Sequence, residues 1–156
     1  MKKVGGKVLL CGFVAVALIF AGAILVKAAQ ECKKKAPEGS IVLKDPAWTE
    51  HTKCPVEFNH QAHADDYGIA CTECHHKYED GKNVWKEGDE ACPCSSCHTN
   101  LEIKGEKKLP EAEQKLNLKL AYHNNCIDCH KAKKKEDAKT AAPVTCAGCH
   151  PKECAK

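Results

Sequence analysis

Cysteine and histidine recur along this chain in a fixed pattern, in which two cysteines stand three positions apart and histidine follows the second. The pattern occurs four times: Cys71, Cys74 and His75; Cys94, Cys97 and His98; Cys126, Cys129 and His130; Cys146, Cys149 and His150. Cys-x-x-Cys-His is the attachment motif of a c-type haem, since both thiols bond covalently to the macrocycle and the histidine ligates the iron. Four copies predict four c-type haems as cofactors.

A second ligand for each iron must come from the five remaining histidines: His51, His60, His63, His76 and His123. We expect a helix capped by Asn59, which would put His60 and His63 on one face. Two side chains on one face cannot bind opposite sides of one porphyrin, so His60 and His63 must serve different haems. Adjacent His75 and His76 also point in different directions. We predict distal ligands at His60, His63, His76 and His123, and expect His51 to be exposed.

Few regular elements are predicted to position these cysteines and histidines. Pro110, acidic residues and then lysines predict a helix over 110–123, and an apolar stripe of Leu109, Ala112, Leu116 and Leu120 would continue to His123. Alternating polarity near Phe58 predicts a strand over 54–58 that pairs with 41–43 in a hairpin. The predicted fold is therefore mainly α with a small N-terminal β-hairpin. It would be a compact multihaem cytochrome with a haem core and little regular structure.

The second motif allows two attachments, because Cys92 also precedes Cys97. We favour Cys94, since a two-residue gap places both sulfurs on one turn, and a four-residue gap from Cys92 remains the alternative. With Cys94 used, four cysteines of the expected mature chain are left over: Cys32, Cys54, Cys92 and Cys154. They permit two disulfides in three connectivities, or free thiols.

The first 28 residues carry lysines, then an apolar run and a small-residue cleavage site at Ala28, as in a secretory signal peptide. We predict cleavage there and one domain over 29–156; an uncleaved membrane anchor is the alternative. Four of the 24 basic residues precede the site, which leaves 20 against 21 acidic residues and a net charge of about −1. This balance does not favour a nucleic-acid partner.

The chain from 52 to 153 resembles the tetrahaem cytochromes c3, the class III c-type cytochromes of sulfate-reducing bacteria. The resemblance rests on Pro-Val-Glu-Phe-Asn-His-Gln-Ala-His before Cys-Thr-Glu-Cys-His-His, on the order of the later motifs, and on a lysine run over 131–135. It implies that His60 ligates the first haem, His76 the second, His63 the third and His123 the fourth. The surplus cysteines and nearly neutral charge are more similar to the membrane-complex-associated type II members.

The predicted function is that of a periplasmic low-potential electron carrier, not an enzyme, because two histidines leave no open position on the iron. The resemblance implies anaerobic sulfate respiration, with hydrogenase or another cytochrome c3 as donor and a membrane cytochrome complex as acceptor. Contact with the membrane would occur only through that complex. The lysines of 131–135 and Lys139 form either a docking collar for an acidic partner or a solvated linker. The rival functions are a zinc module and a membrane-anchored multihaem quinol dehydrogenase or haem reductase.

Overall fold

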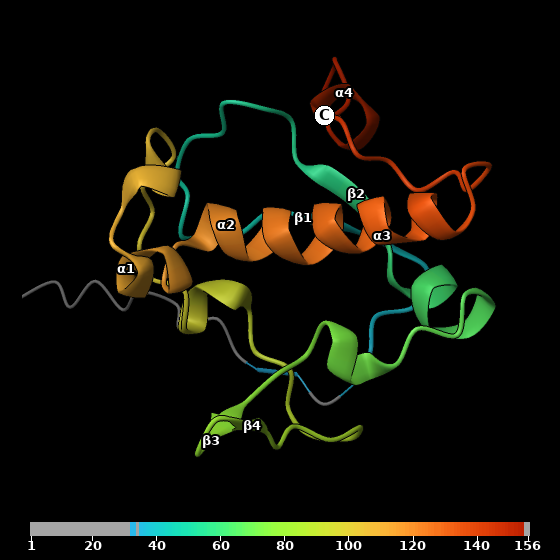
Figure 1. The fold of residues 1–156 in the computed structure, drawn as a ribbon, viewed down its shortest axis with the longest axis horizontal. Helices are drawn as coiled ribbons and strands as arrows, with labels where there is room; N and C mark the ends of the chain where they lie inside the picture. The colour runs from blue at the N-terminus through green and yellow to red at the C-terminus, as the bar shows by residue number, and fades with distance from the viewer. Residues whose placement is uncertain (1–31, 34, 155–156) are drawn as a thin grey trace, which may run out of the picture.

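The computed structural model describes residues 32, 33 and 35–154, and the predicted signal peptide lies outside this part of the chain. Its regular elements are short and are joined by long loops and isolated helical turns (Figure 1). The expectation of little regular structure is therefore confirmed. The expectation of a mainly α fold holds only in part, because helices are the longest elements but loops make up much of the chain. No helix in the described residues is long and apolar enough to cross a membrane.

The N-terminal hairpin is present as predicted. Strand β1 (Ser40–Leu43) pairs antiparallel with β2 (Val56–Asn59), in a register that sets Ile41 opposite Phe58. One face of each strand is exposed and the other half-buried, which explains the alternating sequence pattern. β2 ends at Asn59, directly before the turn that carries His60 and His63.

A second, smaller hairpin was not predicted. Strands β3 (Tyr78–Glu79) and β4 (Lys82–Asn83) are joined by Asp80 and Gly81, and both joining residues have positive φ, at 49° and 76°. Asp-Gly is the pair that a two-residue turn of this kind favours, because glycine adopts positive φ at little steric cost. The strands have only two residues each, too short for an alternating pattern to reveal them.

The predicted single helix over 110–123 is wrong: the chain forms α1 (Glu111–Lys115) and α2 (Leu118–His123), with a break between them. Asn117 has an extended backbone at the break, and its side-chain oxygen accepts a 2.9 Å hydrogen bond from the Leu120 N–H. It therefore caps a new helix instead of continuing the first. The apolar stripe is broken as well, since Ala112 and Leu116 are exposed.

Helical structure continues without interruption from α2 through a π-helical stretch (Asn124–Asp128) into α3 (Cys129–Glu136). This run forms the long rod across the centre of Figure 1. The last helix, α4 (Cys146–Cys149), lies apart from the rod in that view. The third and fourth motifs are thus carried by the rod and by α4.

The apolar core of the polypeptide is very small. Among the described residues, the buried apolar side chains are Cys54, Ala62, Leu118 and Leu120. A domain of this size ordinarily buries well over half of the surface that its unfolded chain exposes. A core this small indicates that the polypeptide packs around material other than its own side chains.

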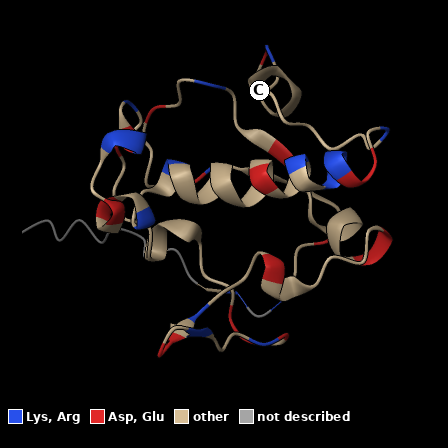
Figure 2. Ribbon diagram, viewed as in Figure 1, with Lys and Arg blue, Asp and Glu red and all other residues tan. Residues whose placement is uncertain are grey.

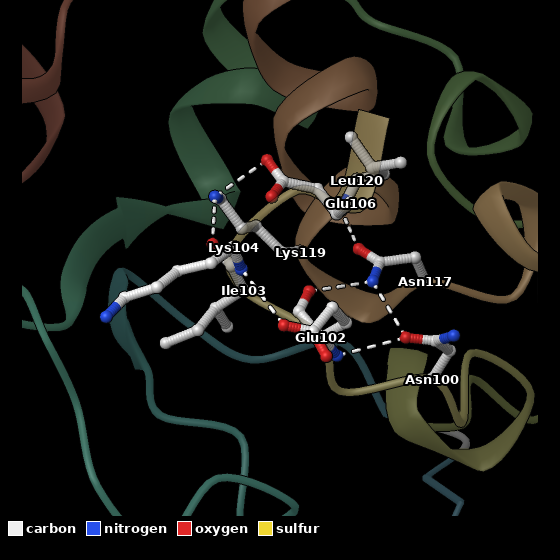
Figure 3. Close-up of polar contacts among 8 residues, drawn as sticks. All are labelled: Asn100, Glu102, Ile103, Lys104, Glu106, Asn117, Lys119 and Leu120. Atoms are coloured by element: carbon white, nitrogen blue, oxygen red, sulfur yellow. Dashed lines mark hydrogen bonds and ion pairs between the residues drawn. The ribbon is translucent and has the colours of Figure 1, made fainter. Parts of the chain in front are cut away.

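A polar cluster replaces part of the missing core (Figure 3). Asn117 is fully buried and donates to the side-chain oxygen of Asn100 and to the Glu102 carbonyl, at 3.0 and 2.8 Å. Lys119 donates to the Ile103 carbonyl at 2.7 Å and forms a 2.7 Å ion pair with Glu106. These contacts attach the loop that follows the second motif to helix α2.

Candidate haem-binding site

Each Cys-x-x-Cys-His motif lies on a helical turn. The first and second motifs begin 3-10 turns (Cys71–Glu73 and Cys94–Ser96), the third lies on the rod, and the fourth forms α4. In the first, second and fourth motifs the histidine N–H donates to the carbonyl of the first cysteine, at 2.8 Å in every case. Each of these histidines is therefore held one turn from the cysteine that opens its motif.

Each motif histidine lies beside one histidine from outside the motifs. The ring centroids are 6.3 Å apart for His60 and His75, 6.2 Å for His63 and His130, 6.0 Å for His76 and His98, and 6.4 Å for His123 and His150. His51, the histidine expected to be left over, is exposed. The pairing keeps His60 apart from His63 and His75 apart from His76, as the steric argument requires.

The pair separations suit a metal held between two imidazoles. A first-row metal binds an imidazole nitrogen at about 2 Å, and the ring centre lies about 1 Å behind that nitrogen, so two rings on opposite sides have centroids about 6 Å apart. All four observed separations lie near this value. Rings in direct edge contact could reach similar distances, but here the spacing recurs four times, always between one motif and one non-motif histidine.

Backbone carbonyls fix the orientation of several of these rings. Nδ1 of His98, His130 and His150 lies 2.7–2.8 Å from the carbonyl oxygens of Lys115, Pro143 and Cys54 respectively. A carbonyl only accepts hydrogen bonds, so Nδ1 must carry the proton and Nε2 keeps its lone pair. This is the arrangement of a metal-binding histidine whose other nitrogen is held by an outer partner. His63 donates to the Asn59 carbonyl in the same way.

His75 is held differently. Its ring stacks on Trp85 at 4.8 Å with an interplanar angle of 24°, while its carbonyl accepts a 3.0 Å hydrogen bond from the Asn83 side chain. Trp85 in turn donates from Nε1 to the Glu90 carbonyl at 3.2 Å. Sequence reasoning missed Trp85 and the carbonyl acceptors. An isolated tryptophan belongs to no sequence motif, and every residue has a carbonyl, so the sequence offered no signal for either contact.

The π-helical stretch separates the directions of two histidines on the rod. His123 pairs with His150, whereas His130 pairs with His63. In a regular α-helix, residues seven apart lie on nearly the same face. A π-helical turn contains more residues than an α-helical turn, so the stretch between these two rotates His130 away from the direction of His123. The close sequence spacing of the two histidines is therefore compatible with two separate partners.

The disulfides settle which cysteines remain available. Cys32 is bonded to Cys92, and Cys54 to Cys154, with Cα atoms 4.1 and 5.0 Å apart. The free cysteines of the described chain are then the eight motif residues: Cys71, Cys74, Cys94, Cys97, Cys126, Cys129, Cys146 and Cys149. Cys92 is occupied, which favours Cys94 at the second motif. The connectivity selects one of the three alternatives left open by the sequence.

Burial shifts the pKa values of a few motif and ligand side chains toward the neutral form. Burial raises the pKa of the Cys126 thiol to about 11, and the nearby Cys74, Cys149 and Cys94 act in the same direction. Burial lowers the pKa of His75, with a further contribution from neighbouring histidines, and burial followed by Lys119 lowers that of His123. A neutral imidazole retains the lone pair that a metal ligand needs.

The indole N–H of Trp48 is a buried donor that the described polypeptide leaves without an acceptor. A buried indole N–H is normally paired. The Trp48 ring lies 6.2 Å from Tyr122, whose hydroxyl donates to Asp45. Paired thiols, paired imidazoles, a small apolar core and this unpaired donor all fit haem, an apolar macrocycle that carries carboxylates.

These features define a protein of the c-type cytochrome class, and the comparisons identify its family. The sequence model of the class III cytochrome C family matches residues 29–150. The chain is 39% identical over 113 residues to cytochrome c3 of Maridesulfovibrio salexigens, an alignment that covers 72% of this chain and 93% of the relative. It therefore belongs to the class III cytochrome C family.

Other relatives carry the same description. Cytochrome c3 of Desulfovibrio desulfuricans is 32% identical over 117 residues, with 72% of this chain and 93% of the relative covered. Cytochrome c3 of Nitratidesulfovibrio vulgaris is 29% identical over 148 residues, and that alignment covers 95% of this chain and 97% of the relative. The matches extend over nearly the full length of each relative, so the family assignment applies to the haem-binding domain as a whole. The protein is a haem-containing electron carrier.

Proposed function

We propose that this protein is a periplasmic, low-potential electron carrier with four covalently bound c-type haems, each ligated by two histidines. The observation that carries the proposal is the pairing of every motif histidine with one non-motif histidine at 6.0–6.4 Å. The ligand sets would be His75 with His60, His98 with His76, His130 with His63, and His150 with His123. Each motif would supply its own two cysteines as thioether attachments.

Bis-histidine c-type haem supplies one-electron exchange at low potential, since methionine ligation, which raises the potential, is absent. The residues of the chain would hold this chemistry in place and restrict it to electron transfer. With haem bound, the two paired imidazoles would hold the iron from both sides and leave no position for a substrate, so the protein would act as a carrier rather than an enzyme. The Nδ1 hydrogen bonds to backbone carbonyls keep the rings oriented for repeated oxidation and reduction.

The chain also ties the sites to one another. Adjacent His75 and His76 belong to different pairs, as do His60 and His63 on the turn that follows β2, and His123 and His130 on the rod. Each of these short segments would bridge two haems, which keeps their separations small and fixed. We therefore expect rapid electron exchange within the protein. Family membership supports a role in anaerobic sulfate respiration, with hydrogenase or another cytochrome c3 as donor and a membrane cytochrome complex as acceptor.

The test is the intact mass of the protein recovered from the periplasmic and membrane fractions of a c-type cytochrome-producing host, combined with its visible spectrum. We expect the mass of a chain that starts at Ala29 with four covalent haems, and a low-spin spectrum without high-spin bands. A haem-free mass would overturn the proposal and favour the zinc module. A full-length chain with four haems in the membrane fraction would instead favour the anchored quinol dehydrogenase, and a persistent high-spin band would favour the open-iron reductase.

A further inference from the structure

The C-terminal segment contacts Cys54 in two ways. The side chain of Cys54 is bonded to Cys154, and its backbone carbonyl accepts a 2.7 Å hydrogen bond from Nδ1 of His150. Cys54 is 8% exposed and lies two residues before strand β2. One buried residue next to the N-terminal sheet is therefore linked covalently to the segment that follows the fourth motif, and by a hydrogen bond to the histidine of that motif.

This arrangement differs from that of the second and third motifs. His98 and His130 donate to carbonyls only 17 and 13 residues away, at Lys115 and Pro143, so local chain structure keeps those acceptors in place. The acceptor of His150 comes from 96 residues away. Among the described residues, the other hydrogen bonds of 146–154 are local ones within the motif or to Thr145 and Pro143. Residues 151–154 are exposed, and two contacts join 146–154 to Cys54 within the described chain, the disulfide and the His150 hydrogen bond.

We propose that Cys54 and Cys154 are positioning residues for the fourth haem: their disulfide holds the Cys54 carbonyl against Nδ1 of His150 and thereby lowers the potential of that haem. The inference rests on the proposed function, since it assigns His150 as an axial ligand. A carbonyl that accepts the Nδ1 proton makes the imidazole a stronger electron donor through Nε2, and outer hydrogen bonding of this kind tunes the metal. Stronger donation stabilises the oxidised iron.

The expected consequence is selective. Without the disulfide, the Cys54 carbonyl loses its covalent tie to the segment that carries His150, although the haem attachments of that segment would remain. The hydrogen bond therefore weakens, and the potential of one haem rises. The other three haems keep their own ring contacts and should change little. The chain offers a matched control in Cys32–Cys92, a second disulfide that closes a long loop. Its neighbours Lys33 and Ala91 exchange backbone hydrogen bonds, and neither Cys32 nor Cys92 hydrogen-bonds to a histidine.

The experiment compares the full chain with Cys54→Ser/Cys154→Ser and with the control Cys32→Ser/Cys92→Ser. Intact mass establishes that each variant carries four haems, which separates a failure of the proposed function from a failure of this inference. Redox titration followed by NMR then gives four potentials, and the exchange rate of the His150 Nδ1 proton reports its hydrogen bond. We expect one potential to rise and this proton to exchange faster in the first variant, with neither change in the control.

Two outcomes overturn the inference: four potentials unchanged in Cys54→Ser/Cys154→Ser, or an equal shift of the same haem in the control. If the first variant does not assemble with four haems, the same measurement is made on assembled protein. The disulfide at Cys54 is reduced with a phosphine and alkylated in the Cys32→Ser/Cys92→Ser background, and the haems are then reoxidised. Mass confirms two added alkyl groups, and an unchanged set of potentials would again contradict the role proposed for Cys54.

Discussion

At the scale of single residues, the pairing of the histidines distinguishes this chain from a zinc module with the same cysteine spacing. The pairs join residues as far apart in sequence as His63 and His130, which no local metal motif would require. Counting gave nine histidines for eight proposed ligand positions, and the clustering of His60, His63 and His76 with the helix expected at His123 left out His51. The individual pairs could not be derived by counting, since they depend on how loops bring distant segments together.

Replacing His123 with methionine should raise the potential of one haem and leave the other three nearly unchanged. Methionine donates less electron density than imidazole, and axial-ligand choice spans about 0.8 V across haem proteins. Redox titration of His123→Met measures the shift, and a sulfur-to-iron charge-transfer band near the red end of the spectrum reports the new ligand. The control is His51→Met, which changes an exposed and unpaired histidine. A shift of equal size in both variants would contradict the assignment of His123.

At the scale of elements, the sequence predicted the features that depend on neighbouring residues, namely the N-terminal hairpin and the cap at Asn59. Alternation near Phe58 indicated the N-terminal hairpin, and Asn59 caps the following turn with a 2.9 Å hydrogen bond from the Ala62 N–H. The prediction of one helix over 110–123 was wrong. The sequence periodicity indicated one continuous apolar stripe, whereas a tertiary contact of Asn117 ends the first helix and starts the second. Asn117 is buried by the loop over 100–106, and its side chain starts a new helix there. The asparagine between two leucines was the sequence signal for this break, because asparagine favours helix caps over helix interiors.

Replacing Asn117 with alanine should destabilise the haem-loaded protein by about 2–4 kcal/mol. The change removes a helix cap worth about 1 kcal/mol, and it leaves the buried Leu120 N–H and the part-buried Glu102 carbonyl without this partner. Unfolding in guanidinium chloride, followed by circular dichroism, measures the free energy. Asn124→Ala is the matched control, because Asn124 is exposed on the same helical rod. An equal loss in both variants would show that the buried cluster contributes nothing of its own.

The Glu106–Lys119 ion pair should add a pH-dependent part to stability. The hydrogen bond from Lys119 lowers the pKa of Glu106 below its usual value of about 4.3. A carboxyl whose pKa is lower in the folded state contributes stability that is full above its unfolded pKa and is lost as pH falls through the folded one. The free energy of unfolding should therefore decrease as pH falls below about 4.3.

Glu106→Gln should remove this part of the pH dependence while lowering stability at neutral pH. Chemical unfolding at a series of pH values between neutral and strongly acidic measures both effects. The control is Glu111→Gln, which breaks an exposed pair with Lys115 that solvent screens. If Glu106→Gln and the unchanged protein lost stability in parallel over the acidic range, the pair would carry no pH dependence.

At the scale of the whole molecule, the chain consists of short helical turns and loops that two disulfides cross-link. They span 60 and 100 residues: one connects the start of the described chain to the exposed Cys92 before the second motif, and the other connects its last residue to the buried Cys54. Composition predicted such a cross-linked chain, since many cysteines and few aromatics cannot build an ordinary core. It could not predict the connectivity, because spacing alone allows three pairings of four cysteines.

Charge is also organised at this scale. The lysine run predicted as a docking collar or a solvated linker lies mainly on α3 (Figure 2). Lys131 and Lys133 form ion pairs with Asp128 and Glu136, at 3.6 and 2.9 Å. Lys135 and Lys139 are exposed and form no ion pair within the described residues. If the run is a docking collar, we expect these two lysines to contribute most of its attraction for an acidic partner.

Reversing the charge of these two lysines should slow electron transfer from an acidic donor. We expect the second-order rate of reduction of Lys135→Glu/Lys139→Glu by hydrogenase, the proposed donor, to fall several-fold at low salt. The difference should shrink as salt rises, because exposed charges are screened beyond about 10 Å at 0.1 M ionic strength. Stopped-flow absorbance at the haem bands measures the rate. Lys82→Glu/Lys86→Glu makes the same charge change near the β3–β4 hairpin, away from α3. A matching loss in that control would indicate a net-charge effect, and rates independent of salt would rule out steering by this surface.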